Sequence, residues 1–251
     1  MTTLVLDAVS RAFGGVHAVE NLSMVLPAGS ITGLIGPNGA GKSTVVNLIT
    51  GLLKVDTGRV TVGTHDITER PPHEVARLGV ARTFQNIRLF TNATVLENLL
   101  VGFHRHEKLG LIENILGLPA VRRETRTLEA RARALLERFD MQRFVDLPAG
   151  DLSYGHQRRV EMMRALASDP QFLLLDEPIA GMNDVEAAQL GEIYRDIAAS
   201  GVGILLIEHN VGFVATHCAQ VNVLNLGRLI AAGTPNEVFR NAEVIEAYVG
   251  S

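Results

Sequence analysis

Hydrophobic and polar positions alternate near the start of the chain, over residues 4–9 and again around Leu22, Met24 and Leu26. A period of two sends successive side chains to opposite faces, as in a β-strand with one buried face. The Pro-Ala-Gly sequence at residues 27–29 is typical of a turn. The pattern therefore predicts two strands in this part of the chain and a turn after the second.

Continuous apolar runs come later in the chain, and they predict strands that are buried on both faces. Such runs occupy residues 31–35, 172–175 and 203–207. Helices are expected at residues 42–50, where Gly51 ends the pattern, and at residues 184–199. Further strands are expected, the last two as a hairpin around Gly227, at residues 59–62, 80–84, 221–226 and 228–231.

The middle of the chain has a different pattern, in which long helical periodicity comes with dense charge. Over residues 122–138, the apolar side chains of Leu128, Ala132, Leu135 and Leu136 share one helical face. The sequence therefore predicts a mostly helical insertion in an α/β chain.

The 251 residues fit one large domain, with residues 1–85 and 166–251 as its core and residues 86–165 as the helical insertion. Charged residues make up 20% of the chain and the net charge is −4, so no global basic field attracts nucleic acid. Cys218 is the one cysteine, which excludes an intrachain disulfide and fits a reducing cytoplasm. We expect it to be a small, buried, apolar side chain.

No segment has the composition of a membrane-spanning helix, which needs about 20 predominantly apolar residues. Residues 209–227 lack Asp, Glu, Lys and Arg, but they contain His, Asn and Gln side chains that are costly in lipid. Residues 1–7 lack the basic and apolar regions of a signal peptide. The chain is therefore expected to be soluble, or to lie on a membrane through another protein.

A glycine-rich segment between a predicted strand and a predicted helix fits G-x-x-x-x-G-K-[ST]. Its glycines let consecutive backbone N–H groups face an anion, and the following helix adds its positive N-terminal end. Lys42 supplies a positive charge for the β and γ phosphates, and Ser43 supplies a hydroxyl for Mg²⁺. The motif predicts a nucleoside triphosphate site formed by Gly36, Pro37, Asn38, Gly39, Ala40, Gly41, Lys42, Ser43 and Thr44.

Two acidic residues, Asp176 and Glu177, follow the apolar run at residues 172–175. A parallel strand delivers its carboxyl end to the ligand crevice of an α/β sheet. We expect Asp176 to hold Mg²⁺, directly or through water, and Glu177 to polarise the water that attacks the γ-phosphate. Both tasks require a carboxylate at this place.

Between these two motifs, residues 152–159 read LSYGHQRR and open a predicted helix, for which Ser153 is a suitable N-cap residue. The segment resembles the L-S-G-G-Q signature of ABC ATPases, with Ser153 and Gly155 in the key places. Tyr154 and His156 depart from the commonest form. The resemblance implies a P-loop NTPase core of the RecA-like α/β type, an N-terminal antiparallel β subdomain and an inserted helical subdomain.

Other residues resemble elements of the same family, in the same order along the chain. Gln85 resembles the glutamine that senses Mg²⁺ and water, and His209 resembles the switch histidine that contacts the γ-phosphate. Phe13 occupies the place of the aromatic residue that stacks on adenine. Residues 180–183 resemble the loop that crosses the dimer, with Asn183 where many members have Asp.

The resemblance also implies a head-to-tail dimer that closes around ATP. One subunit offers the catalytic and metal-binding groups, and the other offers the helix N-terminus at Ser153 and Gly155, which is favourable for an anion. The implied catalytic residues are Lys42, Gln85, Glu177 and His209. The implied Mg²⁺ ligands are Ser43, Gln85 and Asp176.

Residues 82–90, 94–101, 233–235 and 244–250 resemble uptake systems for branched-chain and other hydrophobic amino acids, as does the insertion at residues 110–124. Such systems pair two different ATP-binding subunits, and the long insertion after Val101 resembles the first of them. The implied partners are a second ATP-binding subunit, alike or different, two membrane permease subunits and, indirectly, a periplasmic or extracellular substrate-binding protein. The chain would then be a peripheral protein on the cytoplasmic face of the cell membrane. Residues 88–97 would face the membrane subunits.

Other interpretations concern the cargo and the class of protein. Urea, amides and lipid stay open as cargo, because the substrate contacts lie on other chains. A soluble ABC protein that acts on DNA or ribosomes usually carries a second ATPase core, a long coiled coil or zinc-binding cysteines, which this sequence lacks. A P-loop kinase has no use for the segment at residues 152–157.

Overall fold

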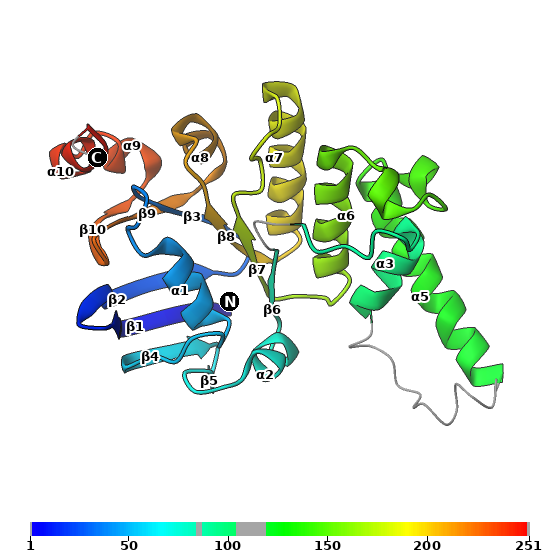
Figure 1. Ribbon diagram of the computed structural model, residues 1–251, viewed down its shortest axis with the longest axis horizontal. Helices are drawn as coiled ribbons and strands as arrows, with labels where there is room; N and C mark the ends of the chain where they lie inside the picture. Colours follow the sequence, from blue (N-terminus) through cyan, green and yellow to red (C-terminus); the bar gives the residue numbers. More distant parts are fainter. Residues whose placement is uncertain (1, 84–86, 104–118, 250–251) are drawn as a thin grey trace. The chain divides into compact units, whose positions relative to one another are not determined.

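The structure, a computed structural model, describes residues 2–83, 87–103 and 119–249 (Figure 1). The chain forms two compact units, one of Met1–Gln85 with Gln171–Ser251 and the other of Asn86–Pro170. The sequence placed the second limit of the helical insertion at residue 165, which lies inside the helix Tyr154–Leu166. That helix lies entirely in the second unit.

The first unit contains a four-stranded antiparallel sheet with the order β2-β1-β4-β5. The predicted period of two is visible in its register, where Leu4 lies opposite Leu26 and Leu6 opposite Met24. All four of these side chains are buried. The antiparallel β subdomain is therefore confirmed, with the strands β1 Thr3–Phe13, β2 Val16–Pro27, β4 Thr57–Val62 and β5 His65–Asp66.

The same unit contains a six-stranded sheet with the order β10-β9-β3-β8-β7-β6. All neighbouring strands are parallel except β10, which forms an antiparallel hairpin with β9. Parallel pairing brings the carboxyl ends of β3, β7 and β8 to one edge of the sheet. The strands are β3 Ile31–Ile35, β6 Val80–Arg82, β7 Phe172–Asp176, β8 Gly203–Ile207, β9 Gln220–Asn225 and β10 Arg228–Gly233.

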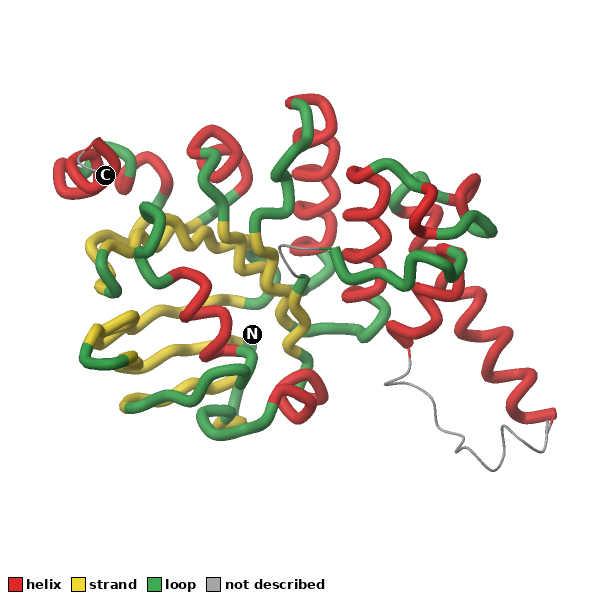
Figure 2. The backbone as a smooth tube through the Cα atoms, in the orientation of Figure 1, coloured by secondary structure: helices red, strands yellow, loops and turns green. Residues whose placement is uncertain are grey.

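Helix α1 packs between the two sheets, as Figures 1 and 2 show. Its buried side chains, among them Val45 and Ile49, belong to one apolar core with residues of both sheets. Helices α7 and α8 lie on the opposite side of the six-stranded sheet. The helices of this unit are α1 Lys42–Ile49, α2 Pro72–Arg77, α7 Asp184–Ala199, α8 Val211–His217, α9 Pro235–Val238 and α10 Ala242–Val249.

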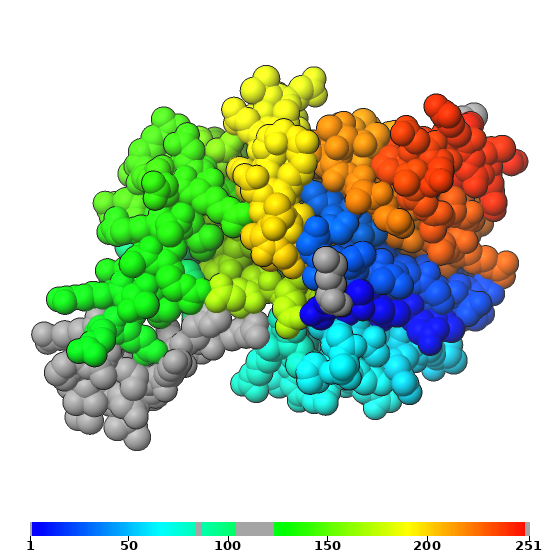
Figure 3. Space-filling model, turned by 180° about the vertical axis from the view of Figure 1, so that it is seen from behind, coloured from blue at the N-terminus to red at the C-terminus, as the bar shows by residue number. Residues whose placement is uncertain are grey.

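The strands of the first sheet gather on one side of this unit and its C-terminal elements on the other, as Figure 3 shows in blue and cyan against orange and red. Cys218, which follows α8, is buried as expected, and burial raises the pKa of its thiol to about 12. A thiol with so high a pKa is inert at neutral pH. Nowhere in the described ranges is a helix long and apolar enough to cross a bilayer.

The second unit is helical, as predicted. Thr94 caps the helix α3 in a capping box with Glu97, in which each side chain accepts a hydrogen bond from the other residue's backbone N–H. Ala132 and Leu136 are buried on one face of α5, as the periodicity predicts. The elements are α3 Val95–Gly102, α5 Pro119–Arg138, α6 Tyr154–Leu166 and two 3₁₀ turns, Gln142–Phe144 and Ala149–Asp151.

Helix α6 contains a buried ion pair, Arg158 with Glu161, whose Nη1 and Oε2 atoms are 3.0 Å apart. We expect Glu161→Leu to lower the free energy of unfolding by about 3–5 kcal/mol, because it leaves a guanidinium charge buried without its carboxylate. Urea unfolding measures the change. The exposed pair of Arg70 and Glu74 is the matched control, and Glu74→Leu should leave the unfolding midpoint almost unchanged. Similar midpoints for both variants would contradict a structural role for the buried pair.

Candidate functional site

The glycine-rich segment forms a loop between β3 and α1, and two of its glycines have no room for a side chain. Gly36 has a φ of 147° and Gly41 a φ of 105°, where L side chains are rarely found. A Cβ atom on Gly36 would lie 2.1 Å from the carbonyl oxygen of Leu224, and one on Gly41 would lie 2.3 Å from that of Ala18. The path of the loop therefore requires glycine at both positions.

The loop is anchored by the turn between β9 and β10. The backbone N–H of Gly227 donates to the carbonyl oxygen of Ala40 at 3.0 Å, and the carbonyl oxygen of Gly227 accepts the N–H of Glu20 at 2.8 Å. The carboxylate of Glu20 also accepts hydrogen bonds from Arg228, from Nε to Oε2 at 2.9 Å and from Nη2 to Oε1 at 2.8 Å. These contacts attach the loop to β2 and to the β9–β10 hairpin.

Lys42, the first residue of α1, bends back over the loop. Its Nζ atom donates to the carbonyl oxygens of Gly36 at 2.7 Å and of Pro37 at 2.9 Å. The side chain is 7% exposed, and burial lowers the pKa of the ammonium, while the carboxylates of Glu177 and Asp176 oppose that shift. The positive charge is thus held among backbone oxygens and faces two acids.

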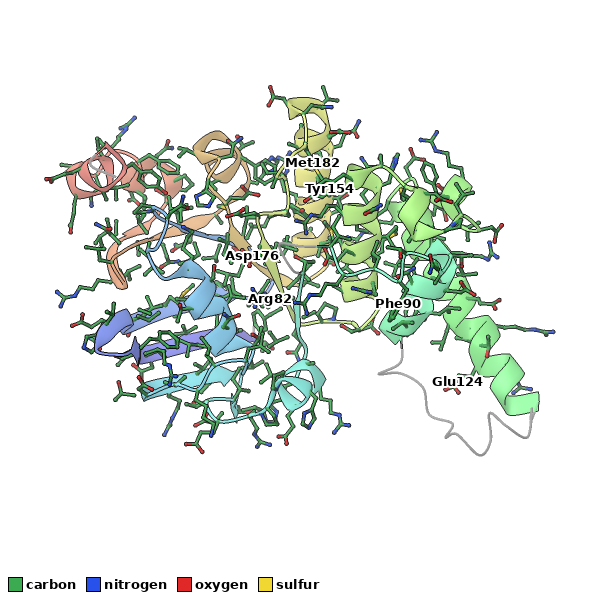
Figure 4. All side chains as sticks on the ribbon, in the orientation of Figure 1. Arg82, Phe90, Glu124, Tyr154, Asp176 and Met182 are labelled. Atoms are coloured by element: carbon green, nitrogen blue, oxygen red, sulfur yellow. The ribbon has the colours of Figure 1, made fainter. Side chains whose placement is uncertain are left out.

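Asp176 ends β7 and is buried, in contact with Arg82 at the end of the neighbouring strand β6 (Figure 4). Nη2 of Arg82 lies 2.9 Å from Oδ2 of Asp176. Nη1 of Arg82 donates to Oδ1 of Asn47 at 2.6 Å. Since Asn47 belongs to α1, a single guanidinium connects three elements that surround the loop.

Glu177 follows Asp176 in the left-handed region, with a φ of 48° that is uncommon for a residue with a side chain. Its backbone N–H donates to the carbonyl oxygen of Ile207, the last residue of β8, at 2.9 Å. Its Oε1 atom lies 2.7 Å from Nε2 of His209. The acid and the histidine that the sequence singled out are therefore in direct contact.

A cavity of about 290 Å³ joins these groups. It brings together most of the residues that the sequence predicted for the site, and it adds Ala18 and Ile207. Gly36 and Pro37 contribute the carbonyl oxygens that hold Lys42. The predicted residues in its lining are Asn38, Gly39, Ala40, Gly41, Lys42, Ser43, Thr44, Asp176, Glu177 and His209.

A larger hollow of about 570 Å³ lies away from this cavity, beside β4 and β5. Besides Glu69, its charged side chains form two ion pairs, Arg59 with Asp66 and Arg70 with Glu74. It contains none of the residues of the predicted site. The residues with candidate chemistry therefore identify the smaller cavity as the candidate functional site.

Phe13, the residue predicted to stack on adenine, ends β1 and is 44% exposed. The guanidinium of Arg11 lies over the ring at 4.8 Å from its centre. Asp56 holds Arg11 through Oδ1 at 2.6 Å and accepts the backbone N–H of Ala12 through Oδ2 at 2.8 Å. Phe13 is not part of the lining of the 290 Å³ cavity. Its support by Arg11 and Asp56 could not be predicted from the sequence, because Asp56 is more than 40 residues away.

Ser153 and Gly155 lie at the N-terminus of α6, in the helical unit. Ser153 is the N-cap residue, as expected, but its side chain makes no capping hydrogen bond. Its Oγ atom lies 2.8 Å from Nδ1 of His156, one of the two departures from the common signature. Because the histidine ring engages the hydroxyl, the expected capping bond is replaced by a contact between side chains. Tyr154, the other departure, is 46% exposed.

Two further residues complete the predicted set. Asn183 is the N-cap of α7, where its Oδ1 atom accepts the N–H of Glu186 at 3.0 Å. An uncharged side chain therefore meets the structural need at this position. Gln85 lies outside the described residues, as do residues 110–118 of the insertion that resembled amino-acid uptake systems.

Sequence reasoning missed two charged residues beside the site, the partly buried Arg82 and the buried Glu208. Glu208 is 4% exposed, and burial raises the pKa of its carboxyl group. Arg82 stands shortly before Gln85, and Glu208 stands between the strand β8 and His209. Their positions next to motif residues were the only available signal, because their partners are remote in sequence.

The ABC transporter family matches residues 19–180 of the chain. A second family, described as branched-chain amino acid ATP-binding cassette transporter, matches residues 228–251. The first match includes the glycine-rich loop, the signature segment and both acids. The second includes β10, α9 and α10.

Curated relatives cover nearly the whole chain. The high-affinity branched-chain amino acid transport ATP-binding protein LivG of Salmonella typhimurium is 41% identical over 248 residues, 98% of this chain and 97% of its own. The corresponding protein BraF of Pseudomonas aeruginosa is 38% identical over the same shares. The lipopolysaccharide export system ATP-binding protein LptB of Escherichia coli is 34% identical over 100% of this chain and 98% of its own.

Solved structures agree with the fold. An ATP-binding cassette of an ABC transporter in its ADP conformation matches with a TM-score of 0.87 and 34% identity over 100% of both chains. A nucleotide-free cassette matches with a TM-score of 0.86 and 33% identity, also over 100% of both chains. With its phosphate loop, paired acids and signature segment in the family's order, the chain belongs to the ATP-binding, ATP-hydrolysing subunits of ABC transporters.

Proposed function

We propose that this chain powers the uptake of branched-chain or other hydrophobic amino acids as one of two ATP-binding subunits of an importer. The observation that carries the proposal is the 41% identity with LivG over 98% of the chain. The match of residues 228–251 to a branched-chain amino acid transporter family supports it independently of the ATPase motifs.

ATP binds at the 290 Å³ cavity in this proposal. The backbone N–H groups of the loop and the ammonium of Lys42 receive the phosphates, since both are donors held toward the cavity. The ring of Phe13 stacks on adenine with the face that Arg11 leaves open, which its exposure permits.

Mg²⁺ fits the donors that the cavity offers. Ser43, whose side chain is exposed, and Asp176 both line it and supply the oxygen ligands that Mg²⁺ prefers. Gln85 is proposed as a third ligand from the resemblance. When bound, Mg²⁺ would neutralise charge on the β and γ phosphates.

Hydrolysis then depends on Glu177 and His209. Glu177 orients a water and takes its proton as the water oxygen attacks the γ-phosphorus and the bond to the β-phosphate oxygen breaks. His209 holds Oε1 of Glu177 at 2.7 Å and lies in the same cavity, in reach of the γ-phosphate. Lys42 stabilises the charge on the departing ADP.

A second ATP-binding subunit completes the site in this proposal. The N-terminus of its α6 equivalent, at the positions of Ser153 and Gly155, approaches the γ-phosphate of this chain, and this chain's α6 serves its partner. A helix N-terminus stabilises an anion by about 0.3–1 kcal/mol at exposed sites and more where water is excluded. ATP would thus hold the dimer closed, and hydrolysis would release it.

The remaining partners are two membrane permease subunits and, through them, a periplasmic or extracellular substrate-binding protein. The chain would lie on the cytoplasmic face of the cell membrane, with residues 88–97 toward the permeases. The exposed Phe90, 57% accessible, supports an interaction at this segment. The net charge of −4 argues against a nucleic-acid partner.

Lipid is the second candidate cargo, because LptB of a lipopolysaccharide export system is 34% identical over the whole chain. Reconstitution separates the two candidates. The membrane partners are co-purified with the chain, placed in proteoliposomes and tested for ATP-dependent uptake of labelled leucine. We expect accumulation of leucine that requires the binding protein. ATP-dependent release of lipid without leucine uptake would overturn the proposed cargo.

A further inference from the structure

Glu208 lies behind the proposed catalytic pair, in the loop between β8 and α8. Its side chain is 4% exposed and does not line the 290 Å³ cavity. A buried carboxylate is costly unless hydrogen-bond donors surround it. The surrounding structure therefore has to supply hydrogen-bond donors to this carboxylate. The groups that donate to Glu208 are the groups whose positions it fixes.

The donors are backbone N–H groups from two different loops. Oε1 of Glu208 accepts the N–H of Ile179 at 3.1 Å, and Oε2 accepts the N–H of His209 at 3.2 Å. Burial raises the pKa of the carboxyl group, and the N–H groups of Ile179, His209 and Asn210 act against that rise. One carboxylate thus connects the loop after β7 with the loop after β8.

The loop after β7 needs such support. It begins at Glu177, whose φ of 48° is unfavourable for a residue with a side chain and persists only where the surroundings hold it. The N–H of Ala180 returns to the carbonyl oxygen of Glu177 at 3.2 Å, and the N–H of Met182 returns to that of Ile179 at 3.1 Å. Fixing the backbone of Ile179 therefore limits the movement of the turn that carries Glu177.

We infer that Glu208 is a positioning residue for ATP hydrolysis, which sets the backbones of Ile179 and His209 so that the side chains of Glu177 and His209 meet over the cavity. The inference rests on the roles proposed above for Glu177 and His209. The same link reaches the loop that leads to Asn183 and α7, so it also fixes the segment expected to cross the dimer.

The test is Glu208→Gln in the assembled transporter. The glutamine keeps the shape and one acceptor oxygen, but its NH₂ group meets a backbone N–H that needs an acceptor. We expect kcat for ATP hydrolysis to fall about 10-fold, because small misplacement of catalytic groups is costly, with KM and ATP affinity changed less than about twofold. Glu237→Gln is the control, since Glu237 also accepts a backbone N–H, from Thr234 at 2.8 Å, far from the cavity.

A double variant separates positioning from general stability. In a His209→Ala background, Glu208→Gln should lower kcat much less than it does in the wild-type protein, because residues that act as a unit are not additive. Equal effects in both backgrounds, or an unchanged kcat for Glu208→Gln, would overturn the inference. If Glu208→Gln does not fold, Glu208→Asp decides by the same criteria, since it keeps the charge but shortens the reach to Ile179.

Glu177→Gln in the same assay tests the underlying function. If Glu177→Gln is inactive while the Glu208 variants hydrolyse ATP normally, the positioning role fails and the proposed chemistry stands. If Glu177→Gln hydrolyses ATP at the wild-type rate, the proposed role of Glu177 is wrong, and the positioning role of Glu208 loses its basis.

Discussion

Glu177→Gln is expected to slow ATP hydrolysis by about 10²–10⁴-fold while the protein still binds ATP. The carboxylate is the proton acceptor in the proposed reaction, and an amide of the same shape cannot take that proton. The amide still offers an oxygen to Nε2 of His209, so the contact that measures 2.7 Å in this structure can persist. Binding groups on the phosphate loop are untouched, which is why affinity should survive.

Two measurements check this expectation. Phosphate release gives the rate, and titration with a fluorescent ATP analogue gives the affinity. Glu192→Gln, an exposed residue of α7 that pairs with Arg195, is the matched control and should behave as wild type. A rate close to that of the wild type would remove Glu177 from the proposed role. The variant should also form a stable dimer with its companion subunit in Mg-ATP.

Lys42→Ala is expected to weaken ATP binding by about 30-fold or more. Removing one partner of a desolvated, hydrogen-bonded charge pair costs roughly 2–5 kcal/mol, and about 1.4 kcal/mol corresponds to a tenfold change in affinity. Nζ of Lys42 is 2.7 Å from the carbonyl oxygen of Gly36 and 2.9 Å from that of Pro37, so it is already held beside the proposed phosphate positions. The side chain of Lys42 therefore loses little further conformational entropy when ATP binds.

Isothermal titration with ATP measures this change. Lys54→Ala provides the control, because Lys54 is an exposed residue shortly after α1 and carries the same charge. An affinity for ATP equal to that of the wild type would show that Lys42 does not contact the phosphates. Thermal unfolding of both variants without nucleotide separates loss of binding from loss of fold.

Elements with a strong local pattern could be predicted from the sequence. The strand Gly203–Ile207 and the helix Asp184–Ala199 have the predicted limits, because a continuous apolar run and an amphipathic repeat bounded by turn residues define them. The glycine-rich loop was predictable for the same reason, since its glycines, lysine and serine are adjacent in sequence. The strand β5 and the helix α2 were not predicted, as each is short and mostly exposed.

The supporting residues of the site could not be predicted, because their meaning comes from tertiary contacts. Arg82 is separated by 35 residues from Asn47 and by 94 from Asp176, and nothing in its neighbourhood indicates either contact. Glu208 reaches Ile179 across 29 residues. Ser153 is the N-cap residue as predicted, but the contact of its hydroxyl with His156, three residues later, was not predicted. Motifs thus indicated the groups proposed to contact ATP, whereas the residues that support them are recognisable only in the folded structure.

The hydrogen bonds that attach the phosphate loop to distant parts of the chain have a consequence for biosynthesis. Ala40 accepts a hydrogen bond from Gly227, and Glu20 forms hydrogen bonds with both Gly227 and Arg228. Arg228 lies 208 residues after Glu20. During synthesis the glycine-rich loop leaves the ribosome early, but Arg228 follows Glu20 only after the long segment between them has been translated. The loop should therefore reach its final conformation only after the turn between β9 and β10 has been synthesised.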